Sequence, residues 1–201
     1  MTRHCDYFPL KMKYPTLFYL TLFFLVFSEI AVAQSENKPK VFSTTQGQVQ
    51  IKSDAPLELI EATSGELRGV IDPLNRNFSF SIKNRSFKGF NSPLQQEHFY
   101  ENYIEAAKYP VSTFKGKIIE QTDLLEDGIH NVRAKGILNI HGVDQERIIR
   151  VNITVKGGVL TAETSFVVPL SDHNIMIPKI VYQKIAEEIQ LNVKANFTLT
   201  D

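Results

Sequence analysis

The side chains with the greatest catalytic potential lie in the stretch SPLQQEHFYENYIEAAKYP, residues 92–110, where His98 stands near Glu97 and Glu101. Histidine beside carboxylates is a frequent composition of metal sites and of general acid–base pairs. The histidines that follow residue 33 are His98, His130, His141 and His173. No two of them stand two or four residues apart, so a local metal-binding motif is missing. His98 is therefore open to two interpretations, a contact to a metal or ligand head group and an ordinary position on a helix.

The patterns of the common hydrolases are also missing from the sequence. A serine hydrolase needs its serine on a sharp strand-to-helix turn, as in Gly-x-Ser-x-Gly, and no such pentapeptide occurs. Glu97 and Glu101 are neighbours on one helix face, whereas glycoside hydrolysis needs carboxylates that face each other across a substrate. Gly157-Gly158 is typical of a hairpin turn and not of a phosphate-binding loop. The sequence therefore predicts a protein without catalysis.

The elements that carry these residues are mostly strands, because the dominant hydrophobic period is two. The clearest segments are NFSFSIK at 77–83, IRVNITVK at 149–156 and EIQLNVKANFTLT at 188–200. Such alternation predicts strands with one dry and one wet face, which is typical of antiparallel sheets. Weaker examples occur at 47–53, 65–72, 111–120, 134–142 and 160–170. The sequence thus predicts about eight antiparallel strands.

Two stretches interrupt the strands. Ser92 and Gln95 form a capping box around Pro93, which predicts a helix over about 93–108 that ends before Tyr109-Pro110. Pro178 predicts the start of a short second helix over about 178–187. The apolar face expected for the first helix consists of Leu94, Phe99, Tyr103 and Ala107.

The first 33 residues have the composition of a secretory signal peptide. Lys11 and Lys13 precede an apolar run over 17–27, and Ala31-Val32-Ala33 forms a small-residue cleavage site. Cleavage after Ala33 predicts a periplasmic or secreted protein without an integral membrane anchor; a retained N-terminal anchor is the alternative. Residues 34–40 are expected to form a flexible tail, and residues 41–201 a single domain.

Charge and cysteine content exclude further classes. Without the leader the chain carries 19 basic and 20 acidic residues, a net charge of about −1, which offers no footprint for nucleic acid. The single cysteine, Cys5, lies in the leader, so the mature chain has no cysteine for a disulfide or a metal. Eight antiparallel strands can hide their apolar faces in a two-sheet sandwich or in a closed barrel, and an eight-stranded barrel has room for packed side chains or one slender ligand.

The order of three segments resembles the YceI-like family of lipid- or polyisoprenoid-binding proteins. They are LQQEHFYENYIEAAKYPVSTFKGKI at 94–118, VRAKGILNIHGVDQER at 132–147 and FVVPLSDHNIMIPKIVYQKIAEEIQLNV at 166–193. The resemblance covers about residues 41–199. It implies an all-β fold, an eight-stranded antiparallel lipocalin-like β-barrel with one capping helix and a short second helix. It also implies an apolar tunnel that holds an isoprenoid, a quinone or a similar amphiphile.

The expected ligand contacts are the inward-facing apolar side chains of this barrel and the inner face of its helix. They are Phe78, Phe80, Ile82, Phe99, Tyr103, Phe114, Ile118, Leu138, Ile140, Val151, Ile153, Phe166, Val168, Leu191, Val193 and Phe197. Only the resemblance favours a tunnel over a filled core at these positions. We expect no cofactor besides the lipid, and a monomer or homodimer. The alternative is a non-catalytic interaction protein with a filled barrel and a partner-binding outer face.

Overall fold

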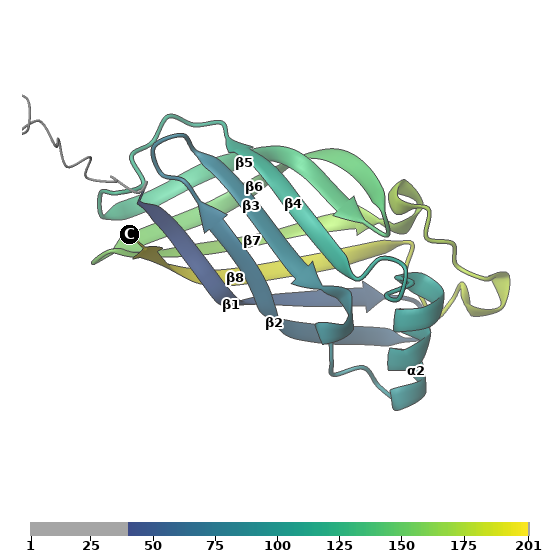
Figure 1. Cartoon of the computed structure of the whole chain (residues 1–201). Coiled ribbons are helices and arrows are strands. Elements are labelled where there is room, and N and C mark those ends of the chain that lie inside the picture. The colour runs from purple at the N-terminus through teal and green to yellow at the C-terminus, as the bar shows by residue number, and fades with distance from the viewer. Residues whose placement is uncertain (1–39, 201) are drawn as a thin grey trace, which may run out of the picture. The chain divides into compact units, whose positions relative to one another are not determined.

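Eight antiparallel strands form a closed barrel, as the sequence predicts (Figure 1). The computed structural model describes residues 40–200, so the expected signal peptide 1–33 and all but the last residue of the tail 34–40 lie outside the described part. Each strand pairs with its neighbours in chain order, and β8 closes the barrel onto β1. The strands are β1 (Val41–Asp54), β2 (Leu59–Ile71), β3 (Asn77–Lys83), β4 (Val111–Ile118), β5 (Gly128–Ile140), β6 (Val143–Lys156), β7 (Val159–Pro169) and β8 (Glu188–Thr200).

The alternating sequence pattern becomes an alternation between the barrel interior and solvent. On β5, Val132, Ala134 and Leu138 are buried, while Arg133 and Lys135 between them are exposed. Successive side chains of a strand point to opposite faces, so a period of two places every apolar residue of the row inside. The same rule operates on β8, where Ala195 and Phe197 are buried beside exposed neighbours.

The eight strands form one closed barrel, in which the two shortest ladders separate β7-β8-β1-β2 from β3-β4-β5-β6. We call these two groups of four strands the two sheets of the barrel. The two ladders that join them are Arg68–Ile71 with Phe78–Ser81 and Asn152–Lys156 with Val159–Glu163. Beyond these ladders β2 parts from β3, and β6 parts from β7. Both separations lie toward the same end of the barrel, where the helical segments gather (Figure 1).

Short polar links cross the two seams between the sheets. In the β2–β3 seam Thr63 forms an isolated bridge with Lys88, whose N–H donates to the Thr63 carbonyl at 2.9 Å. In the β6–β7 seam the Thr164 hydroxyl donates to the Arg150 carbonyl at 2.6 Å. These links satisfy strand-edge groups that would otherwise lose their hydrogen bonds.

Two glycines let β4 and β5 approach each other closely. Gly116 and Gly136 stand opposite each other in the ladder. A Cβ on Gly116 would lie 2.1 Å from the Lys135 carbonyl oxygen, and one on Gly136 would lie 2.3 Å from that of Lys115. No side chain fits at either position, so both residues have to be glycine for this strand contact to form.

One end of the barrel is closed by packed side chains. Phe42, Leu124, Val155 and Leu160 are at most 2% exposed and fill the end opposite to the helical segments. Leu124 belongs to the loop between β4 and β5, which lies across this end. We call these four residues the plug. Because the plug fills this end, the empty part of the interior lies toward the other end of the barrel.

The first helix is shorter than predicted. It comprises α2 (Pro93–His98) and the π-helical turn η2 (Phe99–Tyr103), and the prediction of a helix to 108 is wrong at its C-terminal end. The Ile104 N–H donates to the Phe99 carbonyl at 2.9 Å, and Glu105 then adopts a left-handed φ of 45°. This wide turn buries Tyr100 and Ile104, so the helix stops well before Tyr109-Pro110, and Ala107 is exposed.

The predicted second helix over 178–187 is also wrong in extent. Only the 3-10 turn η4 (Lys179–Val181) forms there. The backbone groups that follow pair with other segments: the Gln183 carbonyl accepts from Leu57 N–H at 2.9 Å, and the Ala186 N–H donates to the Ser53 hydroxyl at 2.9 Å. These hydrogen bonds take the place of the backbone hydrogen bonds that a longer helix would form within itself. Within residues 40–200 no helix is long and apolar enough to span a membrane.

The packing differs between the two ends, and this difference is testable by unfolding in urea. Phe197 is 1% exposed above the plug, so we expect Phe197→Ala to lower the free energy of unfolding by about 3–5 kcal/mol. Phe166→Ala is the matched control, because that ring is only half-buried. We expect a clearly smaller loss there, and equal losses for both variants would contradict a barrel packed at one end only.

Candidate functional site: a blind apolar pocket

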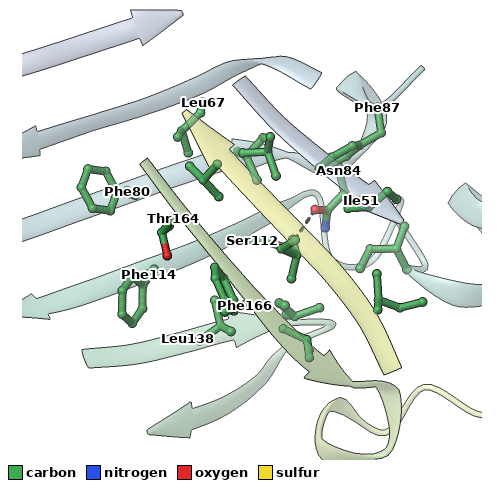
Figure 2. Close-up of a pocket in the computed structure, with 18 of the residues that line it drawn as sticks. Ile51, Leu67, Phe80, Asn84, Phe87, Ser112, Phe114, Leu138, Thr164 and Phe166 are labelled. Atoms are coloured by element: carbon green, nitrogen blue, oxygen red, sulfur yellow. Dashed lines mark hydrogen bonds between the residues drawn. The ribbon is translucent and has the colours of Figure 1, made fainter. Parts of the chain in front are cut away.

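A cavity of about 550 Å³ occupies the barrel between the plug and the helical end. Its lining is mostly aliphatic and aromatic, and all eight strands contribute to it. Figure 2 shows side chains that line it, among them Phe80, Phe114, Leu138 and Phe166. The volume lies in the range of about 300–1,000 Å³ that is typical of small-molecule sites. The barrel is therefore not filled, in contrast to the alternative of a fully packed core.

Four phenylalanine rings form the bottom of the pocket. The ring centroid of Phe78 lies 5.4 Å from that of Phe80 and 4.8 Å from that of Phe114, and Phe80 lies 5.9 Å from Phe197. We call these rings the aromatic floor. Phe80 lies directly over Gly69, where a Cβ would meet the ring at 2.0 Å. The missing side chain at Gly69 thus leaves the space that the Phe80 ring occupies.

All sixteen residues predicted as ligand contacts line this pocket. Their location is an observation, while their contact with a ligand stays a prediction. On β8 the same inward row includes the buried Phe197 and the half-buried Val193 and Leu191 toward the opening. An inward-facing side chain that is still accessible must border empty space. The change from buried to half-buried along this row therefore shows where the packed interior ends and the pocket begins.

The prediction missed other lining residues for two different reasons. Val49, Ile51, Leu67 and Ile71 alternate on β1 and β2, so the period-two pattern contained the information to find them. Residues of irregular segments carry no such pattern. Those at the pocket include Phe87, Phe90, Ile175, Val181 and Ile185.

Two buried polar side chains, Asn84 and Ser53, lie in the pocket wall. The Asn84 side chain, 1% exposed, donates to the Tyr109 carbonyl at 2.6 Å. It accepts from the Ser112 hydroxyl at 2.8 Å (Figure 2). Both hydrogen-bonding atoms of the Asn84 amide are thus occupied. The Ser112 oxygen keeps lone pairs and can still accept a hydrogen bond from a ligand hydroxyl.

The segment α2–η2 forms one side of the opening and is anchored at both ends. At its start the Ser92 hydroxyl accepts from Gln95 N–H at 3.1 Å, and the Gln95 amide donates to Glu58 at 2.9 Å. Further along, the Tyr100 hydroxyl lies 2.5 Å from the Phe87 carbonyl, to which it donates. Tyr103 lines the pocket, and burial raises the pKa of its phenol above 10.0. Tyr103 therefore stays neutral and can donate a hydrogen bond at the opening.

Three ionisable side chains that line the pocket, Glu58, His98 and Lys184, form no ion pair within the described residues 40–200. His98 and Lys184 both line the pocket, and both are exposed. In the same part of the chain no three histidine, cysteine, aspartate or glutamate side chains gather as metal ligands. His98 lines the pocket, and its contact with a ligand head group or a metal stays a prediction.

A second polar cluster fixes the 3-10 turn η3 (Leu170–His173) against the β5–β6 hairpin. His173 is fully buried, and its Nδ1 lies 3.2 Å from the Val143 carbonyl oxygen. His141 Nδ1 lies 3.0 Å from the His173 carbonyl oxygen, and His141 Nε2 lies 2.5 Å from Glu105. Arg147 pairs with Asp172 across the β6–β7 seam. The cluster therefore holds together the segments that border the mouth.

Fold and pocket together define a class of protein, the closed lipocalin-like β-barrel whose interior keeps an apolar pocket at one end. Residues 30–197 match the model of the YceI-like domain, and the chain belongs to that family. No curated protein sequence matches this chain.

Solved structures show the same barrel at low sequence identity. A polyisoprenoid-binding domain from Saccharophagus degradans superposes with a TM-score of 0.66 at 13% identity, over 80% of this chain and 98% of that domain. BcnA of Burkholderia cenocepacia gives 0.63 at 18% identity, over 75% and 95%. The YceI protein of Campylobacter jejuni gives 0.54 at 16% identity, over 79% and 86%. At these identities the similarity concerns the fold.

The buried histidine predicts how stability depends on pH. Burial is the main cause that lowers the pKa of His173 below 6.5, with Arg147 acting in the same direction and Asp172 in the opposite one. The unfolded chain then binds more protons than the folded one as pH falls below 6.5, so acid reduces the free energy of unfolding. Urea unfolding between pH 7 and pH 5 should show this loss.

Two variants assign that loss to one residue. His173→Gln should flatten the pH dependence, whatever it does to stability at pH 7. His98→Gln, at an exposed position, should keep the dependence of the unchanged protein. An unaltered slope in His173→Gln would contradict the role of this histidine.

Proposed function

We propose that this chain binds an isoprenoid, a quinone or a similar amphiphile in its pocket, with the hydrocarbon tail toward the aromatic floor and the polar head at the mouth. The observation that carries the proposal is the one-ended cavity of about 550 Å³ with its apolar lining. Support comes from the similar barrel of the Saccharophagus degradans domain, which is described as polyisoprenoid-binding. In this proposal the sixteen predicted contacts hold the tail.

Hydrocarbon burial supplies enough free energy for such a complex. Each buried methylene contributes about 0.8 kcal/mol, so a tail of about twenty carbons contributes about 16 kcal/mol. Association costs between about 4 and 15 kcal/mol. A mid-range cost of about 9.5 kcal/mol leaves about 6.5 kcal/mol, which corresponds to a Kd of about 20 micromolar. Tail burial is not directional, so any selectivity depends on pocket width and on polar groups such as Ser112 and Tyr103.

The proposed role is carriage, storage or sensing of the lipid without catalysis. Within residues 40–200 no serine of the pocket is hydrogen-bonded to a histidine or a carboxylate: Ser112 donates to Asn84, and Ser53 accepts from Ala186 N–H. Nucleophilic catalysis needs such a base within reach. We place the protein in the periplasm or outside the cell, because residues 1–33 have the composition of a cleaved leader.

Native mass spectrometry of protein purified from its host tests the proposal directly. We expect a population heavier by the mass of one lipid, and organic extraction should release that lipid for identification. The matched control is the same protein after extraction, which should show the apo mass and regain the heavier species when prenyl lipids or quinones are added. An apo mass throughout, with no uptake of either lipid, would refute the proposal.

A charge inside the pocket should abolish uptake. Phe166 faces the pocket, whereas its neighbour Val167 is 48% exposed on the outside of the same strand. We expect Phe166→Asp to weaken lipid binding at least about a hundredfold, because a buried carboxylate without a partner costs several kcal/mol. Val167→Asp should bind as the unchanged protein does. Circular dichroism establishes that both variants are folded, and equal binding by both would contradict the assignment of the pocket.

A further inference from the structure

The most exposed apolar side chains of the described chain gather around the pocket mouth. Within residues 40–200, seven large apolar side chains are at least 64% exposed, and five of these lie at the open end. We call the five the apolar rim. They are Leu57, Leu94, Met176, Ile180 and Tyr182, with exposed fractions of 66%, 65%, 85%, 90% and 64%. The other two, Leu74 and Ile129, lie at the closed end, beside the turn after β2 and at the start of β5.

The rim is continuous with the interior of the pocket. Leu94 both lines the pocket and reaches solvent. Val181 lines the pocket, while its neighbours Ile180 and Tyr182 are exposed. The Leu57 N–H donates to the Gln183 carbonyl at 2.9 Å, so the β1–β2 turn lies against the loop that carries Ile180 and Tyr182. Apolar surface thus extends from the aromatic floor to the outside of the barrel, beside the ionisable mouth residues Glu58, His98 and Lys184.

The charges beside the rim fit one kind of partner. Lys179 and Lys184 flank Ile180 and Tyr182, and neither lysine forms an ion pair with another described residue. Aliphatic tips with tyrosine and lysine are the composition of segments that lie in the head-group region of a bilayer. Glu97 and Glu101 on the neighbouring helical segment are acidic. Only the part of the rim beside the lysines therefore attracts anionic head groups, and the apolar side chains contribute most of the free energy of binding.

We propose that the apolar rim docks on the surface of a phospholipid bilayer and sets the pocket mouth directly against the hydrocarbon region. A tail then passes between bilayer and pocket without crossing water, which would otherwise be the slow step of transfer. The choice of cargo rests on the proposed function, whereas docking depends on the rim alone. Large exposed apolar surfaces of this kind mark interaction sites, and here the position at the mouth identifies the partner as a membrane.

A pair of labelled variants tests docking at the level of one side chain. In the full chain with Cys5→Ser, Met176→Cys and Ile129→Cys each receive an environment-sensitive fluorophore; these positions are 85% and 75% exposed at opposite ends. Vesicles of phosphatidylcholine, with and without phosphatidylglycerol, are then added. We expect emission at position 176 to shift to the blue and rise at least about threefold, more strongly with phosphatidylglycerol, and emission at position 129 to stay unchanged.

The other outcomes overturn the proposal. An equal response at both positions would assign adsorption to another part of the chain, such as the N-terminal segment. No response at position 176 would show that the rim does not enter the bilayer. A response at position 176 that follows protein concentration in the absence of vesicles would show that the rim pairs with a second copy of this chain.

Transfer kinetics separate docking from binding. The double variant Met176→Glu/Ile180→Glu should slow the transfer of a fluorescent prenyl lipid from vesicles at least about tenfold. The same variant should take up a water-soluble short-chain prenyl alcohol with unchanged affinity. The matched control Leu74→Glu/Ile129→Glu, at the closed end, should transfer at the original rate. Unchanged transfer by the rim variant would overturn the proposal; failure of the unchanged protein to take up the alcohol would instead overturn the proposed function and leave the vesicle result intact.

Discussion

The pocket exists because strand ladders join the two four-stranded sheets at one end only. The ladders between β2 and β3 and between β6 and β7 are short, and beyond them the sheets diverge. Where the ladders hold the sheets together, Phe42, Leu124 and Leu160 fill the interior. Where the sheets part, the same inward rows no longer meet across the barrel. A strand edge that lacks its ladder must find other partners, which the Thr164–Arg150 and Thr63–Lys88 links provide.

The open end shows how irregular segments complete a regular barrel. The π-helical turn of η2 widens the helix so that Tyr100 packs beneath it while Tyr103 faces the pocket. The loop after η3 gives its backbone groups to the β1–β2 turn and to Ser53 instead of forming a helix. These segments carry the polar and the exposed apolar side chains of the mouth. The strands thus determine the shape and polarity of the pocket, and the loops determine which side chains surround its mouth.

The period-two pattern predicted the eight strands, their antiparallel pairing and the inward residues, and the sixteen predicted contacts do line the pocket. Helix extent was predicted less well. The capping box at Ser92 correctly marked the helix start, because capping is a local interaction. The end at Tyr103 depends on Tyr100 reaching the Phe87 carbonyl, a contact between segments that the local sequence does not contain. The turn Lys179–Val181 is short because the backbone groups that follow it are hydrogen-bonded to Leu57 and Ser53, which are also distant in the sequence.

Whether the barrel is filled or hollow was not decidable from the sequence, since inward phenylalanines suit both a packed core and a pocket lining. The sequence by itself determined which side chains face inward, because strand alternation follows from backbone geometry alone. Only the tertiary structure decided where these side chains contact one another across the barrel. Phe80 has space because Gly69 lies opposite it, and Phe166 borders a void because β7 has left β6 at that point. Closure and divergence of sheets arise from long-range pairing, which no local pattern encodes.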